Sequence, residues 1–199
     1  MRGFFIELPS CELIVLPHFN NFTRTITQSG NQMKKYFVLF LLTLFLIGCS
    51  KTTDQEYLDQ ANKFVKENNI PEAIKSFESL ISDYPESELA PKALVQIASI
   101  YQNQLVKNLK SDESFNKAQN YFMQVYEKYP DDQDAPKSLF LSGFILANDL
   151  RKYDEATSRL KLFLEKYPSH PLAVSAQLEL DNMGLSPEEI LRRTETAKQ

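Results

Sequence analysis

Cysteine, glycine, histidine and tryptophan are scarce in this 199-residue sequence, and the shortage excludes several kinds of site. From position 49 onward these four residue types are represented only by Cys49, Gly143, His170 and Gly184. They cannot form an internal disulfide, a zinc cluster or a Cys–His or Ser–His pair. Two glycines cannot make a glycine-rich phosphate loop. We therefore expect a protein that is not an enzyme and that holds no metal and no other cofactor.

Two features beside prolines could be mistaken for functional sites. His170 lies in a turn between two prolines, and we interpret it as a helix-start residue. Asp131, Asp132 and Asp134 follow a proline and precede the next helix, where negative charge stabilises the N-terminus. Calcium binding is the alternative for this acidic run.

A short apolar segment has the features of an export signal. It spans the twelve residues 36–47, follows Lys34 and Lys35, and is followed by Gly48. Crossing a bilayer needs about 20 residues, so this segment is too short to span one. A basic start, a short apolar stretch and a small residue before the cleavage point are typical of a secretory signal peptide. We therefore expect residues 33–48 to be a signal peptide.

Residues 1–32 do not fit this scheme, because an export signal normally begins with its charged segment. Charged residues and prolines interrupt every apolar stretch there. We expect translation to start at Met33, which leaves residues 1–32 untranslated. An extended leader is the alternative.

The end of the apolar segment, Leu46-Ile47-Gly48-Cys49, resembles the lipobox of bacterial lipoproteins. The resemblance implies that a signal peptidase cuts before Cys49 after a diacylglycerol has been added to its sulfur. Acyl chains such as palmitate would then hold the protein on a membrane, since each buried methylene contributes about 0.8 kcal/mol. Ser50 favours the outer membrane by analogy with that class, and we expect the periplasmic side. An ordinary buried cysteine is the alternative.

Charge excludes one class of partner. Four of the 22 basic residues and two of the 26 acidic residues precede Cys49, which leaves residues 49–199 with a net charge near −6. The two signs alternate along the chain, whereas phosphate binding needs clustered Lys and Arg. We therefore expect no nucleic-acid partner.

The remainder of the chain contains a helical repeat. Tyr-Pro occurs three times, with an alanine eleven residues before each tyrosine and another five residues after each proline. The tyrosines are Tyr84, Tyr129 and Tyr167, the preceding alanines are Ala73, Ala118 and Ala156, and the following ones are Ala90, Ala135 and Ala173. Apolar residues between these marks recur at offsets of three, four and seven, which places them on one face of a helix.

Each of these helices is preceded by a partner helix with a small residue, at Ala61, Ala98 or Gly143. The pattern Leu94-x-x-Ile97-Ala98-x-x-Tyr101, followed by Ala118-x-x-x-Phe122, resembles the tetratricopeptide signature. The resemblance implies an all-α fold, a tetratricopeptide-like α-solenoid of antiparallel helix pairs. The Tyr-Pro steps of 45 and 38 residues exceed the usual 34. We place the extra residues of the longer step at 102–114, as longer helices that join near Ser111.

These patterns predict the domain organisation. Residues 49–55 form a lipidated linker, and residues 56–184 form a tetratricopeptide-repeat domain of about three repeats plus a trailing helix. Gly184 closes that helix, and Ser186 with Glu189 forms a capping box that opens the next one. Residues 185–199 then form a C-terminal capping helix with a polar face.

The lipobox, the exported repeat domain and the Tyr-Pro-x4-Ala step together look like the BamD (YfiO) family of outer-membrane lipoproteins. That family belongs to the machinery that inserts β-barrel proteins into the outer membrane. The resemblance implies a lipid-anchored protein–protein interaction scaffold of the bacterial cell envelope, with a role in outer-membrane protein assembly. Its partners would be other envelope proteins or peptides, and the membrane itself. A YbgF-like envelope adaptor is one alternative, and a small membrane-anchored enzyme or solute-binding protein is another.

Counting around the first helix of each pair, from the small residue to the opposite face, gives a candidate partner-binding groove. Its residues are Asn62, Lys66, Val95, Ser99, Asn103, Phe140, Phe144 and Asn148. Amides such as those of Asn103 and Asn148 can both donate to and accept from an extended peptide backbone. Phe140 and Phe144 would supply the apolar anchor of the site. The alternative is that the asparagines end helices and the phenylalanines are buried by the trailing helices.

Overall fold

The computed structural model describes residues 51–196, and every regular element in that part of the chain is a helix. These are α2 (Asp54–Lys66), α3 (Ile70–Asp83), α4 (Ala90–Gln102), α5 (Ser111–Lys128), α6 (Ala135–Asn148), α7 (Tyr153–Lys166), α8 (Ala173–Asn182) and α9 (Pro187–Thr196). The predictions for residues 1–32, for the signal peptide at 33–48 and for a lipid on Cys49 lie outside the described residues. None of the helices within 51–196 has the length and apolar character needed to cross a membrane.

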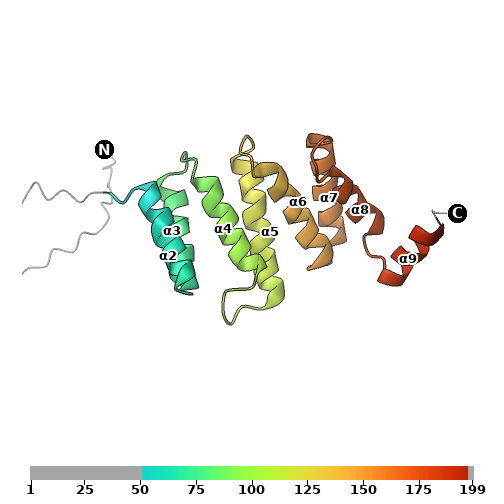
Figure 1. Cartoon of the computed structure of the whole chain (residues 1–199), viewed down its shortest axis with the longest axis horizontal. Coiled ribbons are helices and arrows are strands. Elements are labelled where there is room, and N and C mark those ends of the chain that lie inside the picture. The colour runs from blue at the N-terminus through green and yellow to red at the C-terminus, as the bar shows by residue number, and fades with distance from the viewer. Residues whose placement is uncertain (1–50, 197–199) are drawn as a thin grey trace, which may run out of the picture. The chain divides into compact units, whose positions relative to one another are not determined.

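The helices from α2 to α7 form three antiparallel pairs that follow one another in chain order (Figure 1). The pairs are α2 with α3, α4 with α5, and α6 with α7, and each pair packs on the next through α3–α4 and α5–α6 contacts. α8 packs on α7 and also touches α6. We call α2, α4, α6 and α8 the first helices, and α3, α5 and α7 the second helices. The predicted all-α solenoid of antiparallel helix pairs is confirmed.

The three Tyr-Pro turns share one geometry. Each second helix ends at a tyrosine with φ between −131° and −135° and ψ between 53° and 59°, because the following proline disfavours the α region. The residue three positions after each tyrosine has a side chain that accepts a hydrogen bond from the backbone N–H two residues later in the chain. Ser87 Oγ accepts from Leu89 at 3.1 Å, Asp132 Oδ1 from Asp134 at 2.8 Å, and His170 Nδ1 from Leu172 at 3.1 Å. His170 is therefore a turn residue at a helix start, as the sequence predicted.

Small residues let neighbouring helices approach closely. Ala61, Ala98, Ala118 and Ala156 are all fully buried. A Cβ added at Gly143 would lie 3.0 Å from Cγ of Leu160, which is closer than ordinary van der Waals contact. Glycine at this point therefore allows α6 to pack tightly against α7.

The second pair has a longer internal connection than its neighbours. The prediction that both of its helices lengthen is wrong for α4, which has 13 residues, as α2 has. Residues 103–110 form a loop instead, and Gln104 leaves the helix with a φ of 53°. Only α5 is longer, at 18 residues. The loop is held because Ser111 Oγ donates to Gln104 Oε1 at 2.8 Å and the buried Ser114 Oγ donates to the Tyr101 carbonyl at 2.6 Å.

The last two helices are joined by a tight turn. Gly184 has a φ of +77°, a conformation that glycine adopts without strain, and it ends α8. The predicted capping box is confirmed, since Glu189 N–H donates to Ser186 Oγ at 3.3 Å and Ser186 N–H donates to Glu189 Oε2 at 2.8 Å. Arg193 Nη1 donates to the Asp181 carbonyl at 2.8 Å, which ties α9 to the end of α8.

Candidate functional site

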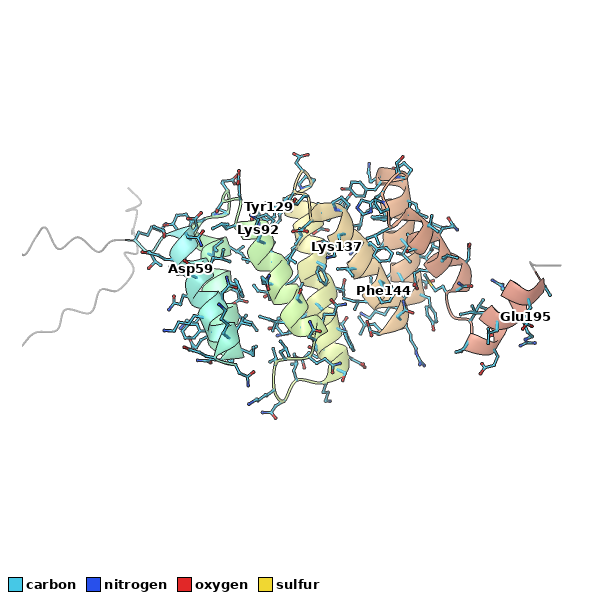
Figure 2. The ribbon with its side chains drawn as sticks, in the orientation of Figure 1. Asp59, Lys92, Tyr129, Lys137, Phe144 and Glu195 are labelled. Atoms are coloured by element: carbon cyan, nitrogen blue, oxygen red, sulfur yellow. The ribbon has the colours of Figure 1, made fainter. Side chains whose placement is uncertain are left out.

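The first helices carry all eight residues of the predicted groove, at intervals of four residues. Asn62 and Lys66 lie on α2, Val95 and Ser99 on α4 with Asn103 at its C-cap, and Phe140, Phe144 and Asn148 on α6. Intervals of four keep the residues of each helix on one face. Figure 2 labels Asp59, Lys92 and Lys137, which also come from α2, α4 and α6.

A hollow of about 220 Å³ lies between α2 and α4, and it joins two of the predicted residues, Asn62 and Val95. Leu58, Lys92, Gln96 and Asp134 complete its lining. Leu58 and Val95 are partly buried and pack against the core, so the hollow has apolar surface. Asn62 and Gln96 add two amides, and Lys92 and Asp134 add one charge of each sign. This lining can contact an apolar side chain and hydrogen-bond to a peptide backbone at the same time.

Four of the six residues around this hollow were not predicted from the sequence. Leu58 lies one helical turn before Asn62, and three residues before the small residue Ala61. Val95 has the same relation to Ala98. Extending the series on α2 by four residues toward the helix start would therefore have found Leu58. Asp134 belongs to the turn before α6, and only the packing of successive pairs brings it to α2 and α4.

The prediction of Phe140 as an exposed anchor is wrong. Its side chain is only 7% exposed, and its ring centroid lies 5.7 Å from that of Phe163 and 6.0 Å from that of Phe144. Phe140 belongs to a cluster that includes Ala176 of α8. α7 and α8 therefore bury Phe140, as the alternative interpretation proposed, whereas Phe144 is only partly buried.

The amide groups of the two asparagines are partly used within the protein. Asn103 Nδ2 donates to the Ser99 carbonyl at 2.8 Å, and Asn103 is the C-cap of α4. Asn148 Nδ2 donates to the Phe144 carbonyl at 3.2 Å and to Glu179 Oε2 at 2.9 Å. Both side chains thus help to end a helix. Asn62, whose amide lines the hollow, is the better candidate for contacting a partner.

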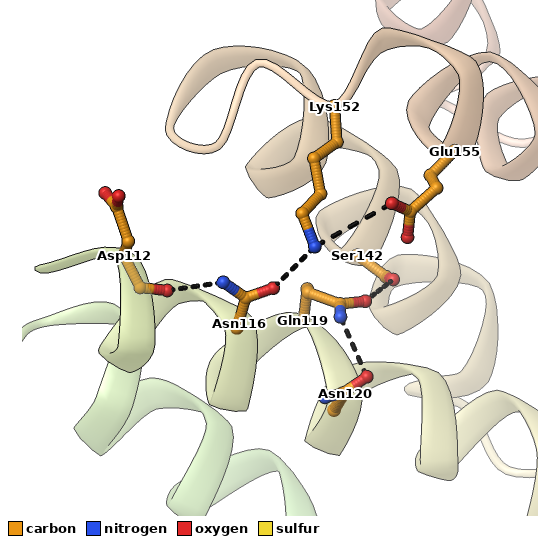
Figure 3. A network of polar contacts seen from close by, with 7 residues as sticks. All are labelled: Asp112, Asn116, Gln119, Asn120, Ser142, Lys152 and Glu155. Carbon is orange, nitrogen blue, oxygen red and sulfur yellow. Dashed lines mark hydrogen bonds and ion pairs between the residues drawn. The ribbon is translucent and has the colours of Figure 1, made fainter.

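A polar network fixes the second pair against the third (Figure 3). Lys152 Nζ donates to Asn116 Oδ1 at 2.9 Å and lies 3.7 Å from Glu155 Oε1. Ser142 Oγ donates to Gln119 Oε1 at 3.3 Å, and both of these side chains are buried. Within residues 51–196, no buried side-chain nitrogen or oxygen lacks a hydrogen-bond partner. A fully satisfied network of this kind holds the register between helices, and hence the relative positions of α4 and α6.

Tyrosine hydroxyls tie successive pairs together along the solenoid. Tyr129 donates to the Pro85 carbonyl at 2.8 Å, from the second Tyr-Pro turn to the first, whereas Tyr84 donates to the Thr52 carbonyl at 2.8 Å within the first pair. Tyr121 donates to Glu78 Oε1 at 2.8 Å, from α5 to α3. Burial raises the pKa of Tyr121, and the hydrogen bond to Glu78 raises it further, so this hydroxyl stays protonated as a donor. These links fix the spacing of the pairs and therefore the width of the groove.

Residues 55–87 and 137–170 match the tetratricopeptide repeat. The first match covers α2 after its first residue, α3 and the first Tyr-Pro turn, and the second covers most of α6, α7 and the third turn. No curated protein matches the chain. In the described part of the chain, no group of three or more His, Cys, Asp or Glu residues could hold a metal ion. Two of the three helix pairs therefore match the tetratricopeptide repeat, a repeat that typically serves in protein–protein interaction scaffolds.

Proposed function

We propose that the protein is a lipid-anchored interaction scaffold of the bacterial cell envelope, whose first helices bind segments of other envelope proteins. The observation that carries the proposal is the hollow between α2 and α4, with its apolar surface from Leu58 and Val95 and its amides from Asn62 and Gln96. An extended segment can place a side chain against the apolar surface while the amides bond to its backbone. The opposite charges of Lys92 and Asp134 would orient that segment.

Rigidity of the groove supports the same function. The Tyr129 hydroxyl bridges two turns, and the Gln119–Ser142 pair joins α5 to α6, so the first helices keep their spacing. A site that is already formed loses less conformational entropy when a partner binds. The partner can therefore be captured by a small number of contacts.

The anchor in this proposal is Cys49, with the lipobox-like residues 46–49 as its support. Several acyl chains on one cysteine give stable membrane attachment, whereas a single chain gives only marginal attachment. Ser50 supports the outer membrane as the location, on its periplasmic side. A scaffold at that membrane, with the BamD-like features of the sequence, supports a role in outer-membrane protein assembly.

The groove is tested by removing its amides. We expect replacement of both Asn62 and Gln96 by Ala to remove two hydrogen bonds between the hollow and the partner's backbone. The amount of partner protein that is cross-linked to the purified chain should then fall about tenfold or more. The matched control replaces Gln124 on α5 and Gln133 in the second Tyr-Pro turn by Ala. Equal yields from both double variants, with unchanged circular dichroism, would place the binding surface elsewhere.

The anchor is tested at Cys49. Cys49→Ala should release the protein from membranes after carbonate extraction, and mass spectrometry of the unaltered protein should find acyl chains on the N-terminal peptide. Ser50→Ala is the control, and it should stay on the membrane. Membrane retention of Cys49→Ala would show that attachment does not depend on a lipid at this residue.

A further inference from the structure

A second hollow, of about 290 Å³, lies between the first two Tyr-Pro turns, and we call it the turn hollow. Its apolar lining comes from Pro91 at the start of α4 and from Tyr129 and Pro130 of the second turn. The Tyr129 hydroxyl donates to the Pro85 carbonyl at 2.8 Å, so a hydrogen bond joins the two turns that line the hollow. The walls of the turn hollow are therefore held at a fixed spacing.

The lining of the turn hollow carries an excess of negative charge. Four carboxylates face the one ammonium group of Lys128, and they belong to Glu86, Glu88, Asp131 and Asp132. Lys128 Nζ donates to Gln124 Oε1 at 3.0 Å and makes no ion pair within residues 51–196. In the same part of the chain, the side chains of Glu86, Glu88 and Asp131 have no hydrogen bond or ion pair. These three carboxylates are therefore available to a cation of a partner.

Two tyrosines lie in the electric field of these carboxylates. Burial raises the pKa of Tyr129, and the charge of Glu86 raises it further. Burial is also the main cause of the raised pKa of Tyr167, with smaller contributions from Tyr126 and Asp131. Negative charge near a hydroxyl disfavours its ionised form. Both hydroxyls thus sense the negative charge at the turns.

The turn hollow adjoins the hollow between α2 and α4. Pro91 lines the turn hollow, and the next residue, Lys92, lines the other one. Asp132 and Asp134 also lie one in each lining, and Asp132 Oδ1 accepts the Asp134 N–H at 2.8 Å. Figure 2 labels Tyr129 and Lys92, one residue from each hollow. A segment that lies between α2 and α4 can therefore continue into the turn hollow.

We propose that the partner segment bound between α2 and α4 continues into the turn hollow and places an arginine or lysine side chain beside Glu86, Glu88 and Asp131. This inference rests on the proposed function, because the hollow between α2 and α4 supplies the start of the path. The apolar lining suits the methylene stem of a basic side chain, and the carboxylates suit its charged head. A metal ion fits less well, since no group of three or more His, Cys, Asp or Glu in the described residues could hold one.

Selection of random peptides displayed on phage tests the inference, with the purified full-length chain in non-ionic detergent as the target. Peptides enriched on the unaltered chain should share an apolar residue and, at a fixed spacing from it, an arginine or lysine. Glu86→Gln, Glu88→Gln and Asp131→Asn together should remove the preference for the basic residue and keep the preference for the apolar one. The three replaced side chains are exposed, so this triple variant should fold, which circular dichroism checks.

A synthetic copy of one enriched peptide gives the size of the effect. Fluorescence anisotropy should show roughly fivefold weaker binding to the triple variant than to the unaltered chain. Added salt should weaken binding to the unaltered chain more than binding to the triple variant. The control for net charge replaces three exposed acidic residues in the first turns of α3 and α5 by their amides, at Glu72, Asp112 and Glu113. This control should bind the peptide as tightly as the unaltered chain does.

The outcomes separate this inference from the function on which it rests. Enriched peptides that share an apolar residue but no basic one would overturn the inference and leave the proposed function standing. Equal losses of affinity in the triple variant and the control would also overturn it, because only net charge would then matter. Self-association in sedimentation that the triple variant abolishes would show that the occupant is a second copy of this chain. Selected peptides that share no residue would contradict the proposed function and this inference together.

Discussion

The three helix pairs from α2 to α7 and the end formed by α8 and α9 are built from the same sequence step but differ in burial. In the pairs, phenylalanines such as Phe77, Phe122 and Phe163 are almost entirely buried. In α8 the only buried residue is Ala176, while Val174 and Leu178 are exposed. A Tyr-Pro sequence therefore specifies a turn and the helix that follows it. Burial of that helix depends on whether another helix pair packs against it. Stability should follow this division between the pairs and the end.

The largest contrast should come from truncating one apolar side chain in each region. Phe122→Ala should lower the free energy of unfolding by about 3–5 kcal/mol, because it leaves a cavity in the core. Leu178→Ala removes an exposed side chain and should change it by about 0.5 kcal/mol or less. Urea unfolding followed by circular dichroism measures both. Similar losses would mean that α8 is buried in solution.

A smaller contrast concerns overpacking. Ala118 is fully buried, so Ala118→Leu should cost about 1–3 kcal/mol of stability. Gln177→Leu adds a leucine at an exposed position of α8 and should have little effect. Thermal melts compare the two variants. An unchanged melting temperature for Ala118→Leu would contradict the packing of α5 described above.

The smallest difference in stability between the two regions should come from removing a capping box, which is present both at the start of α2 and at the start of α9. Thr53 caps α2 as Ser186 caps α9, each with a glutamate three residues ahead. Thr53→Ala should lower global stability by about 1 kcal/mol, since α2 belongs to a packed pair. Ser186→Ala should speed hydrogen exchange in α9 alone. The pKa of Glu189 is lowered first by the backbone N–H of Ser186, which alanine keeps, and then by the Ser186 side chain, so the substitution should raise this pKa only in part. A global loss from Ser186→Ala would show that α9 is coupled to the pairs.

The sequence predicted the parts of the fold that depend on short-range patterns. Tyrosine followed by proline specified all three turns, and the buried alanines specified where helices meet. The loop at 103–110 was not foreseen, because its closure depends on specific hydrogen bonds from Ser111 and Ser114 to α4. A periodic pattern carries no information about such bonds.

The candidate groove was predicted less completely than the fold. Counting around single helices found Asn62 and Val95, but it also selected Phe140, which α7 and α8 bury. Asp134 was missed because it reaches the hollow from the turn before α6. Exposure on a first helix depends on what the next pair covers, and that is a property of the assembled solenoid.

The central claim is that the first helices, rather than the second helices, contact the partner. Site-specific photo-cross-linking in cells tests it most directly, with a photoreactive residue at Asn62 or Ser99 on the first helices and at Lys75 or Gln124 on the second helices. The account predicts cross-linked partner bands from Asn62 and Ser99 and none from Lys75 and Gln124. Bands from Lys75 and Gln124 alone would contradict it, because the partner would then lie on the second helices.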